Sequence, residues 1–424
     1  MRFFILLAFL VGWTTPQDET PVDYSGHKVI TVTPNDKEEL EFLRSLGMRF
    51  LLDFWTDPRT IKVPIMIRIS PEYIDDVEEA LKEAGMTFKV SILDLQRAIE
   101  AERVANAPTP EIDKRASAEH FQRYLRIEEI NQFLQSVASN YPSISSVITI
   151  GATFENRKIM GVKIGSGNSG TKPAILIECG IHAREWVSVS SCLYNIHELT
   201  SKYATDSTIK SLVDNHEWYI IPSSNPDGYV YTWTMDRMWR KTRTRSIKFV
   251  PPWCRGADAN RNFDISHCGP GTSTNPCEDI YCGDSPFSEN ESRALRDLIN
   301  QIGGSRIKVY FAVHSYSQLW MYPYGHKRVL PPNYGELDRL CKIGTDALRK
   351  VHGTNFKCGS ISNIIYPAAG SSLDWAYEKA GVKIGFALEL RDEGRHGFML
   401  PKDQIVPTCE ETFKGIEATI LAIQ

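Results

Sequence analysis

Two histidines and two glutamates are the side chains whose types and spacing suggest chemistry. His182 and Glu185 are three positions apart, so both side chains can turn to one point, whereas His314 and Glu389 lie much later in the chain. Two imidazoles and one carboxylate hold a catalytic zinc ion and leave its fourth position open. Such an ion polarises a carbonyl group and lowers the pKa of water. We therefore expect zinc-dependent hydrolysis at His182, Glu185 and His314, although a His-x-x-Glu pair by itself fits an ordinary surface histidine equally well.

The elements that must bring these residues together are apolar runs. Helical and strand-like segments alternate from about Ala116 to Gln424, which is typical of an α/β domain. Strands this apolar are buried on both faces by helices, and open α/β sheets bind ligands beyond the carboxyl ends of their strands. The four side chains should therefore converge at one edge of a sheet. The runs are 174–177, which precedes His182, then 218–221, then 309–313, which His314 follows, and 384–388, which Glu389 follows.

A smaller unit precedes that domain. Residues 27–93 have the pattern strand, helix, strand, strand, helix, strand, which is the ferredoxin-like order. Its first helix is predicted over 36–46 and should end at Gly47, because glycine is common just past a helix. Residues 94–105 look helical as well. We expect this α+β unit to fold as a domain of its own.

Two processing sites are indicated outside the folded units. Arg2 and the apolar run 3–11 are typical of a secretion signal in residues 1–16, because the run is too short to span a bilayer. A buried N-terminal strand is the alternative. The pair Lys114-Arg115 follows a Pro-rich linker and suits a trypsin-like protease, although any linker can contain two basic residues. The precursor should comprise residues 1–16, 17–115 and 116–424.

Composition bears on partners and on the redox compartment. The net charge of −4 over 424 residues gives no reason to expect nucleic acid or an anionic membrane as a partner. Nine cysteines fit an oxidising destination. Spacing alone does not determine their pairing, and the odd number leaves at least one thiol unpaired. Cys341, Cys358 and Cys409 are the candidates for that thiol.

Six short blocks stand out in the larger domain: His182-Ala-Arg-Glu-Trp186, Asn225-Pro-Asp-Gly228, Trp239-Arg-Lys-Thr-Arg243, Asp258-Ala-Asn-Arg-Asn262, His314-Ser-Tyr-Ser317 and Glu389-Leu-Arg-Asp392. In content, order and separation they resemble the pancreatic-type zinc metallocarboxypeptidases, the carboxypeptidase A and B family. The smaller unit and its dibasic junction resemble that family's inhibitory propeptide and activation site. The resemblance implies a mixed central sheet flanked by helices, one zinc ion per chain, and removal of C-terminal residues from peptides. We also expect a secreted, monomeric zymogen.

The resemblance assigns the reacting groups one by one. The three ligands named above match the family's zinc ligands. Glu389 matches the general base that takes a proton from water and returns it to the leaving amine, with a structural ion pair to Arg391 as the alternative. Arg240 matches the group that stabilises the oxyanion. Asp258 matches the carboxylate that orients His182.

Other positions match residues that hold the substrate. Asn260 and Arg261 match the pair that binds the C-terminal carboxylate, for which a guanidinium fork has suitable geometry. Tyr366 matches a mobile tyrosine that closes over that carboxylate, with a buried core tyrosine as the alternative. Arg184 matches a secondary substrate contact. Tyr316 is also expected to contact the substrate.

Specificity depends on the floor of the side-chain pocket. Leu373 occupies the position that sets this floor in the family, and leucine offers apolar surface where an aspartate would attract lysine or arginine. Burying an apolar side chain there is favourable by ~1.5–3 kcal/mol, whereas burying an unpaired ammonium is costly. We therefore expect a preference for aliphatic or aromatic C-terminal residues. Ser371 replaces an expected glycine and leaves the preferred size open. The other lining positions are apolar too: Met321, Ile361, Ile365, Ala368 and Ala387.

Two further features of the sequence follow from the resemblance and from a short motif. Cys179–Cys192, Cys254–Cys277 and Cys268–Cys282 resemble the three bridges of the B-type enzymes. Asn290-Glu-Ser292 is an N-glycosylation sequon.

A B-like or other C-terminal specificity, a catalytically silent secreted homologue and a zinc deacylase all fit parts of the pattern. The segment 165–170 fits the dinucleotide motif G-x-G-x-x-G, but that motif requires a helix after it, and the run 174–177 reads as a strand.

Overall fold

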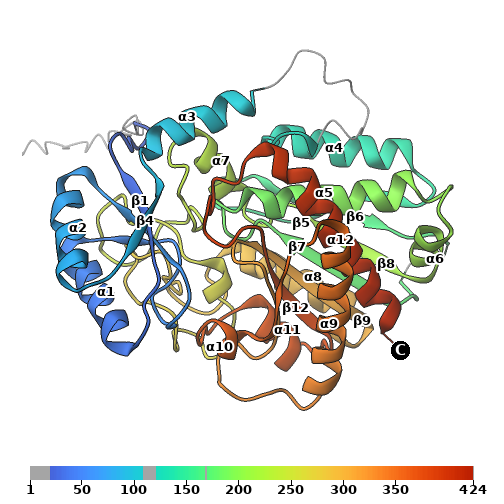
Figure 1. The fold of residues 1–424 in the computed structure, drawn as a ribbon. Helices are drawn as coiled ribbons and strands as arrows, with labels where there is room; N and C mark the ends of the chain where they lie inside the picture. Colours follow the sequence, from blue (N-terminus) through green and yellow to red (C-terminus); the bar gives the residue numbers. More distant parts are fainter. Residues whose placement is uncertain (1–19, 108–120, 168–169, 424) are drawn as a thin grey trace, which may run out of the picture.

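The computed structural model describes residues 20–107, 121–167 and 170–423, and these form two units that lie against each other (Figure 1). The smaller unit, drawn in blue, packs on one side of the larger one. The helix α3 (Leu95–Ala105) leads away from the smaller unit. The expected signal at 1–16 and the pair Lys114-Arg115 lie outside the described residues.

The smaller unit has the order of strands and helices that the sequence indicates. Its four strands form one antiparallel sheet in the order β2-β3-β1-β4. Leu43, Val77 and Leu81 from its two helices are fully buried in an apolar core of its own. Its elements are β1 (Lys28–Val32), α1 (Lys37–Phe50), β2 (Asp53–Phe54), β3 (Ile65–Ile69), η1 (Pro71–Tyr73), α2 (Ile74–Glu83) and β4 (Phe88–Ile92).

The prediction that the first helix ends at Gly47 is wrong. The helix α1 continues to Phe50, and Leu51 takes the left-handed conformation at its end, with φ of 50°. Gly47 lies inside the helix. The position requires glycine because a Cβ atom there would lie only 2.4 Å from the ring of Phe54. The glycine is therefore a packing requirement and not a stop signal.

The larger unit is built on one eight-stranded mixed sheet in the order β11-β10-β12-β9-β7-β8-β6-β5. The four central strands, β12, β9, β7 and β8, are parallel to one another. Antiparallel pairs join β10 to β12, β6 to β8 and β5 to β6. The strands are β5 (Ser145–Ala152), β6 (Lys158–Ile164), β7 (Ala174–Cys179), β8 (Glu217–Ile221), β9 (Ile307–Ser315), β10 (Leu319–Tyr322), β11 (Lys357–Ser360) and β12 (Gly385–Leu390).

Helices cover both faces of this sheet, as the continuously apolar strands predict. Along β7, Ile175 and Ile177 belong to one core, whereas Ala174 and Leu176 belong to the other. The helices α4, α5, α9 and α12 pack on the first face, and α8 and α11 pack on the second. The helices of this unit are α4 (Ile127–Asn140), α5 (Trp186–Ser201), α6 (Ser207–Asn215), α7 (Pro226–Thr234), η3 (Ala259–Arg261), α8 (Asn290–Ile302), η4 (Gly304–Arg306), α9 (Tyr334–His352), α10 (Ile361–Ile364), α11 (Ser372–Glu378), η5 (Lys402–Gln404) and α12 (Ile405–Ala422).

Four disulfides link cysteines of the larger unit. The three pairs expected from the resemblance are bridged, and a fourth bridge joins Cys341 of α9 to Cys358 of β11. Cys409 in α12 is a free and buried thiol. The sequence left these last three cysteines undecided because their pairing depends on where α9 and β11 meet.

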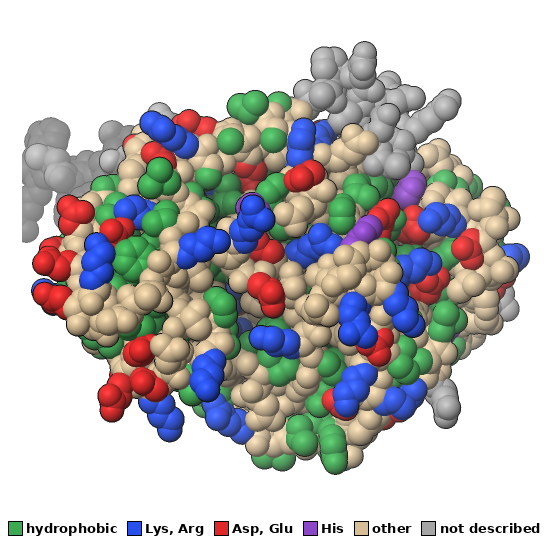
Figure 2. All heavy atoms as spheres, in the orientation of Figure 1, with side chains coloured by type: hydrophobic (Ala, Val, Ile, Leu, Met, Phe, Trp, Pro, Cys, Tyr) green, Lys and Arg blue, Asp and Glu red, His purple; other side chains and the backbone are tan. Residues whose placement is uncertain are grey.

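The surface carries both signs of charge. Basic and acidic side chains are mixed over the face shown in Figure 2, which agrees with the small net charge of −4. In the part of the chain that the structure describes, no helix has the length and apolarity needed to cross a membrane.

The first turn of α8 contains a buried acid that makes stability depend on pH. Glu291 is 2% exposed, and neither of its carboxylate oxygens has a hydrogen-bond partner among the described residues. Burial, followed by the negative charge of Glu289, raises the pKa of Glu291 from 4.5 to about 8. Between these two values the folded chain binds a proton that the unfolded chain releases, so stability should fall as the pH rises.

Replacing Glu291 by glutamine should remove this loss. We expect the variant to melt about 2 °C above the parent at pH 8 and at the same temperature as the parent at pH 5. Thermal unfolding at both pH values measures the difference. Glu128→Gln, at an exposed position in the first turn of α4, is the control. A parent-like slope in the Glu291→Gln variant would contradict the assignment.

Candidate active site

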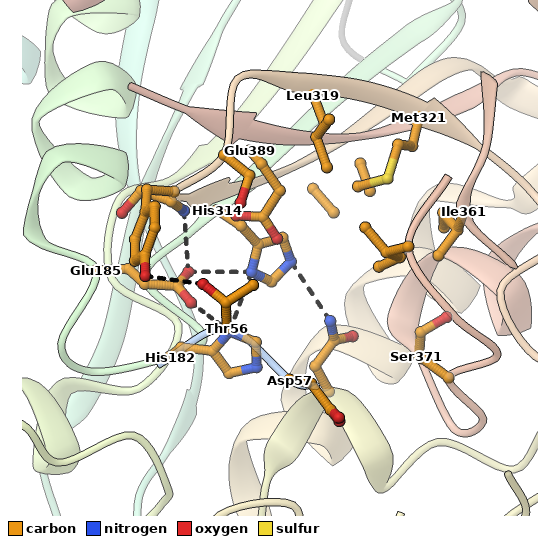
Figure 3. Close-up of a pocket in the computed structure, with 18 of the residues that line it drawn as sticks. Thr56, Asp57, His182, Glu185, His314, Leu319, Met321, Ile361, Ser371 and Glu389 are labelled. Carbon is orange, nitrogen blue, oxygen red and sulfur yellow. Dashed lines mark hydrogen bonds and ion pairs between the residues drawn. The ribbon is translucent and has the colours of Figure 1, made fainter. Parts of the chain in front are cut away.

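The side chains of His182, Glu185 and His314 meet in one buried cluster (Figure 3). Their ligand atoms all lie within 4.8 Å of one another. His182 Nδ1 is 2.8 Å from Glu185 Oε1 and 3.1 Å from His314 Nδ1, which is 3.1 Å from Glu185 Oε2. Two imidazole nitrogens that face each other at this distance need a cation or a proton between them, because their lone pairs otherwise repel. Two histidines and one carboxylate are the ligand set of a catalytic zinc ion, so the residues present fit this metal.

The order of the strands produces this convergence. β7 and β9 are parallel neighbours with Cys179 opposite Val313, so the segment that leaves β7 passes beside the end of β9. His182 lies in that segment, and Glu185 directly precedes α5. His314 is still part of β9, whereas the sequence placed it just beyond the strand. The carboxyl edge of the sheet therefore collects the three ligands.

Asp258 connects the metal cluster to Arg240. Its Oδ1 is 3.1 Å from His182 Nε2, the ring nitrogen that faces away from the cluster. Its Oδ2 accepts hydrogen bonds from Arg240 Nε and Nη2 at 2.9 and 2.7 Å. Arg240 Nη1 is also 3.8 Å from Glu185 Oε1. The guanidinium group is therefore held beside the cluster, with its charge available to an anion that forms there.

Glu389 lies next to the cluster without belonging to it. It lies on β12 and pairs in register with His314 on the neighbouring parallel strand β9, and it lines the same cavity. Like His314, it is within its strand, not beyond it. Burial, followed by the charge of Glu185, raises the pKa of Glu389 to about 8. A bound cation would act in the opposite direction and favour the carboxylate.

The charges of the cluster support one another. Burial opposes ionisation of Glu185, but the two histidines hold the pKa of its carboxyl below the usual value. Burial also opposes the charged form of His314, yet Glu185 raises its pKa to about 9. The carboxylate is therefore negative under neutral conditions, as a metal ligand must be, whereas His314 has to release its proton when a metal ion binds.

Next to the cluster lie the residues expected to bind the substrate carboxylate. Asn260 is within η3, and its Nδ2 is 3.4 Å from His314 Nε2. Arg261 is 5% exposed and donates hydrogen bonds to the carbonyl oxygens of Gly271 and Asn260. Tyr366 lines the same cavity, and burial raises the pKa of its hydroxyl. The structure thus brings these three side chains to the cavity that the metal cluster also lines.

An apolar recess extends from this polar end. The cavity has a volume of about 140 Å³. Leu373 is 2% exposed in the first turn of α11, and Ser371 caps that helix by accepting a hydrogen bond from the Asp374 N–H at 3.2 Å. Ser371 also lines the recess, as does Leu319, which the sequence did not single out. The expected residues Met321, Ile361, Ile365, Ala368 and Ala387 all line it as well.

Three residues of the smaller unit also line this cavity: Trp55, Thr56 and Asp57, from the segment between β2 and β3. Thr56 Oγ1 is 3.0 Å from the hydroxyl of Tyr316, and Figure 3 shows Thr56 and Asp57 among the side chains that face the cavity. The Arg59 guanidinium lies 5.2 Å from the ring centre of Tyr366. The smaller unit therefore forms part of the wall of this cavity.

Buried polar contacts hold α3 and the N-terminal segment of the smaller unit on the larger one. Glu102 in α3 forms an ion pair with Arg237 at 2.5 Å, and both side chains are buried. The Tyr24 hydroxyl donates a hydrogen bond to Asp236 at 2.7 Å. Breaking either contact would leave a buried charge or hydroxyl without its partner, which is costly.

One expected substrate residue lies outside the cavity. Arg184 donates hydrogen bonds to the Met238 carbonyl and to Asp279, and its guanidinium stacks 4.3 Å from the ring centre of Phe398. Phe398 itself lines the cavity, although nothing in the sequence singles it out. An isolated phenylalanine carries no chemical signal, so only its position identifies it.

Family models match both units of the chain. Residues 130–415 match the model described as zinc carboxypeptidase, and residues 30–102 match the model described as carboxypeptidase activation peptide. The two matches coincide with the larger unit and the smaller unit.

Individual proteins are similar over almost the full length. Carboxypeptidase A2 of Mus musculus is 40% identical over 98% of this chain and 97% of its own, and carboxypeptidase B of Homo sapiens is 39% identical over 93% of this chain and 92% of its own. The crystal structure of thrombin activatable fibrinolysis inhibitor matches with a TM-score of 0.86 at 30% identity, covering 94% of this chain and 99% of that one. The carboxypeptidase A from Helicoverpa armigera matches with a TM-score of 0.84 at 29% identity, covering 94% of this chain and 98% of that one.

Proposed function

The chain belongs to the zinc carboxypeptidase family and is a metallocarboxypeptidase with an activation peptide, and on that premise we propose that it releases aliphatic or aromatic residues from the C-termini of peptides. The single observation that carries this specificity is that apolar side chains, Leu373 among them, line the cavity that the cluster of His182, Glu185 and His314 also lines.

The proposed reaction uses the residues around the cluster in sequence. A zinc ion bound there supplies a Lewis acid and lowers the pKa of water. Glu389 takes the proton of the attacking water on its carboxylate and passes it to the nitrogen of the leaving residue. The position of Glu389, in register with His314 and in the lining of the same cavity, supports this role.

Charged and polar side chains are proposed to act at two points of the substrate. Arg240 lies close enough to the cluster to stabilise the carbonyl oxygen as it becomes negative. Arg261, the Asn260 amide and the Tyr366 hydroxyl are proposed to hold the terminal carboxylate. A chain that continues past this point has no carboxylate to offer, so these residues would restrict cleavage to the last bond. Tyr316 is proposed to contact the preceding part of the substrate, and Arg184 to support that side through Phe398.

We also propose how the precursor is made and activated. Residues 1–16 would direct secretion and be removed, and a trypsin-like protease would cut near Arg115. The contacts of Thr56 and Arg59 with Tyr316 and Tyr366 support a covered cavity before that cut. The mature enzyme is proposed to act as a monomer.

The test is an assay of the purified precursor before and after trypsin. Peptides that differ only in a C-terminal Phe, Leu, Arg or Glu are compared by kcat/KM. We expect turnover only after trypsin treatment, and the highest kcat/KM for the peptides that end in Phe or Leu. A preference for Arg would overturn the proposed specificity and leave the peptidase class intact.

Exchanging the floor residue should reverse the preference. In Leu373→Asp a carboxylate replaces the apolar floor, so the ratio of kcat/KM for Arg over Leu peptides should rise at least about 10-fold. Leu373→Asn, which is polar but uncharged, is the matched control and should lose Leu peptides without gaining Arg. If Leu373→Asp kept the parental ratio, residue 373 would not form the floor.

A further inference from the structure

A buried chain of polar groups runs beneath the cavity from the core of the sheet to α11. The Tyr310 hydroxyl lies 2.9 Å from Glu178 Oε2 and 2.9 Å from Ser372 Oγ. Glu178 and Tyr310 are fully buried and Ser372 is 1% exposed. Leu176 pairs with Tyr310 across β7 and β9, and Glu178 lies two residues after Leu176 in the same strand. The side chains of Glu178 and Tyr310 therefore point to the same face of the sheet.

The number of protons available limits which hydroxyl can donate in these two hydrogen bonds. A phenol has one proton to donate. When Tyr310 donates it to Glu178, the contact with Ser372 requires the serine hydroxyl to donate to the tyrosine. Each group then has one preferred partner. A phenylalanine at position 310 would fill nearly the same volume, so the hydroxyl is not explained by packing alone.

Ser372 connects this chain to the substrate site. Its backbone N–H donates a hydrogen bond of 2.9 Å to Asn260 Oδ1. With its oxygen held there, the Asn260 amide presents Nδ2 to the cavity, 3.4 Å from His314 Nε2. The next residue is Leu373, which lines the same cavity.

We propose that Tyr310, held by Glu178, is a positioning residue that fixes the Ser372 backbone amide and thereby aims the Asn260 side chain at the terminal carboxylate of the substrate. The inference rests on the proposed role of Asn260 in carboxylate binding. It adds Tyr310 and Glu178, which do not line the cavity, and it predicts that their effect appears in binding of the carboxylate and not in the metal centre.

The test compares Tyr310→Phe with the parent after trypsin treatment of the full chain. We expect KM for the parent's best peptide to rise about five-fold with kcat changed by less than about two-fold, because one buried hydrogen bond is lost and ground-state binding weakens. The Ki of 3-phenylpropanoate, which needs the carboxylate site, should rise equally. The Ki of acetohydroxamate, which needs only the metal, should not change.

Two further comparisons separate positioning from general stability. Tyr229→Phe removes an equally buried hydroxyl, which donates to the Leu125 carbonyl at 2.6 Å, and should leave KM and both Ki values unchanged. Ser372→Ala breaks the same chain at its other end and should reproduce the Tyr310→Phe result, so the inference remains testable if Tyr310→Phe fails to fold. Glu178→Gln keeps an acceptor for the tyrosine and should shift KM less than Glu178→Leu.

Two outcomes would overturn the inference. One is a parental KM and parental 3-phenylpropanoate Ki in folded Tyr310→Phe or Ser372→Ala. The other is an equal rise of both inhibitor constants, which would indicate general loosening of the site. The KM values are compared on whichever peptide the parent prefers. A preference for Arg would therefore contradict the proposed specificity without affecting this test.

Discussion

Replacing Glu389 by glutamine should lower kcat of the trypsin-activated chain by about 10²–10⁴-fold while zinc remains bound. Glutamine has the same shape and can still accept a hydrogen bond, but it cannot take a proton from water at neutral pH. Glu389 lies in register with His314, yet it is outside the trio of ligand atoms. The change should therefore remove proton transfer and spare metal binding.

Steady-state kinetics and zinc content per chain measure the two halves of this expectation. Glu378→Gln is the control, because Glu378 lies at the end of α11 and pairs with Lys327 at the surface. Its kcat should equal that of the parent. A Glu389→Gln variant with more than about a tenth of parental turnover would remove Glu389 from the role of base.

Removing the metal should abolish turnover and lower the melting temperature together. His182, Glu185 and His314 place two ring nitrogens and a carboxylate at 2.8–3.1 Å from one another. Without a cation the two facing nitrogens must take up a proton or repel each other. The metal ion binds the folded chain and not the unfolded chain, so its removal should lower the stability of the folded state. Dialysis against 1,10-phenanthroline followed by assay and thermal unfolding tests this, and added Zn²⁺ should restore both properties.

A ligand variant provides an independent version of the same test. His314→Ala should lose zinc and activity, whereas His216→Gln should retain both. His216 is also a buried histidine, but its Nδ1 is hydrogen-bonded to the Leu212 carbonyl, away from the cluster. Full activity in a metal-free preparation would refute a metallopeptidase mechanism for this chain.

The smaller unit shows which structural features can be predicted from local sequence patterns. The order of its strands and helices was predictable because apolar periodicity and turn residues are local properties. Its first helix was predicted too short because the reason for Gly47, contact with Phe54, involves a residue that follows in the next strand. The same limit applies to Thr56 and Asp57, whose place in the cavity of the other unit has no signature in their own segment.

The sequence by itself determined the residue types of this site, the apolar strands that lead to them and, through six ordered blocks, the family resemblance. Only the tertiary structure decided which side chains surround one cavity, because that depends on strand order. His182 and His314 are 132 residues apart, and their ring nitrogens meet because β7 and β9 are neighbours. The link from Glu178 through Tyr310 and Ser372 to Asn260, the seating of Trp55–Asp57 and the Cys341–Cys358 bridge likewise join distant segments. Such contacts form when buried polar groups find partners in the folded core, and no local pattern records which partner each one finds.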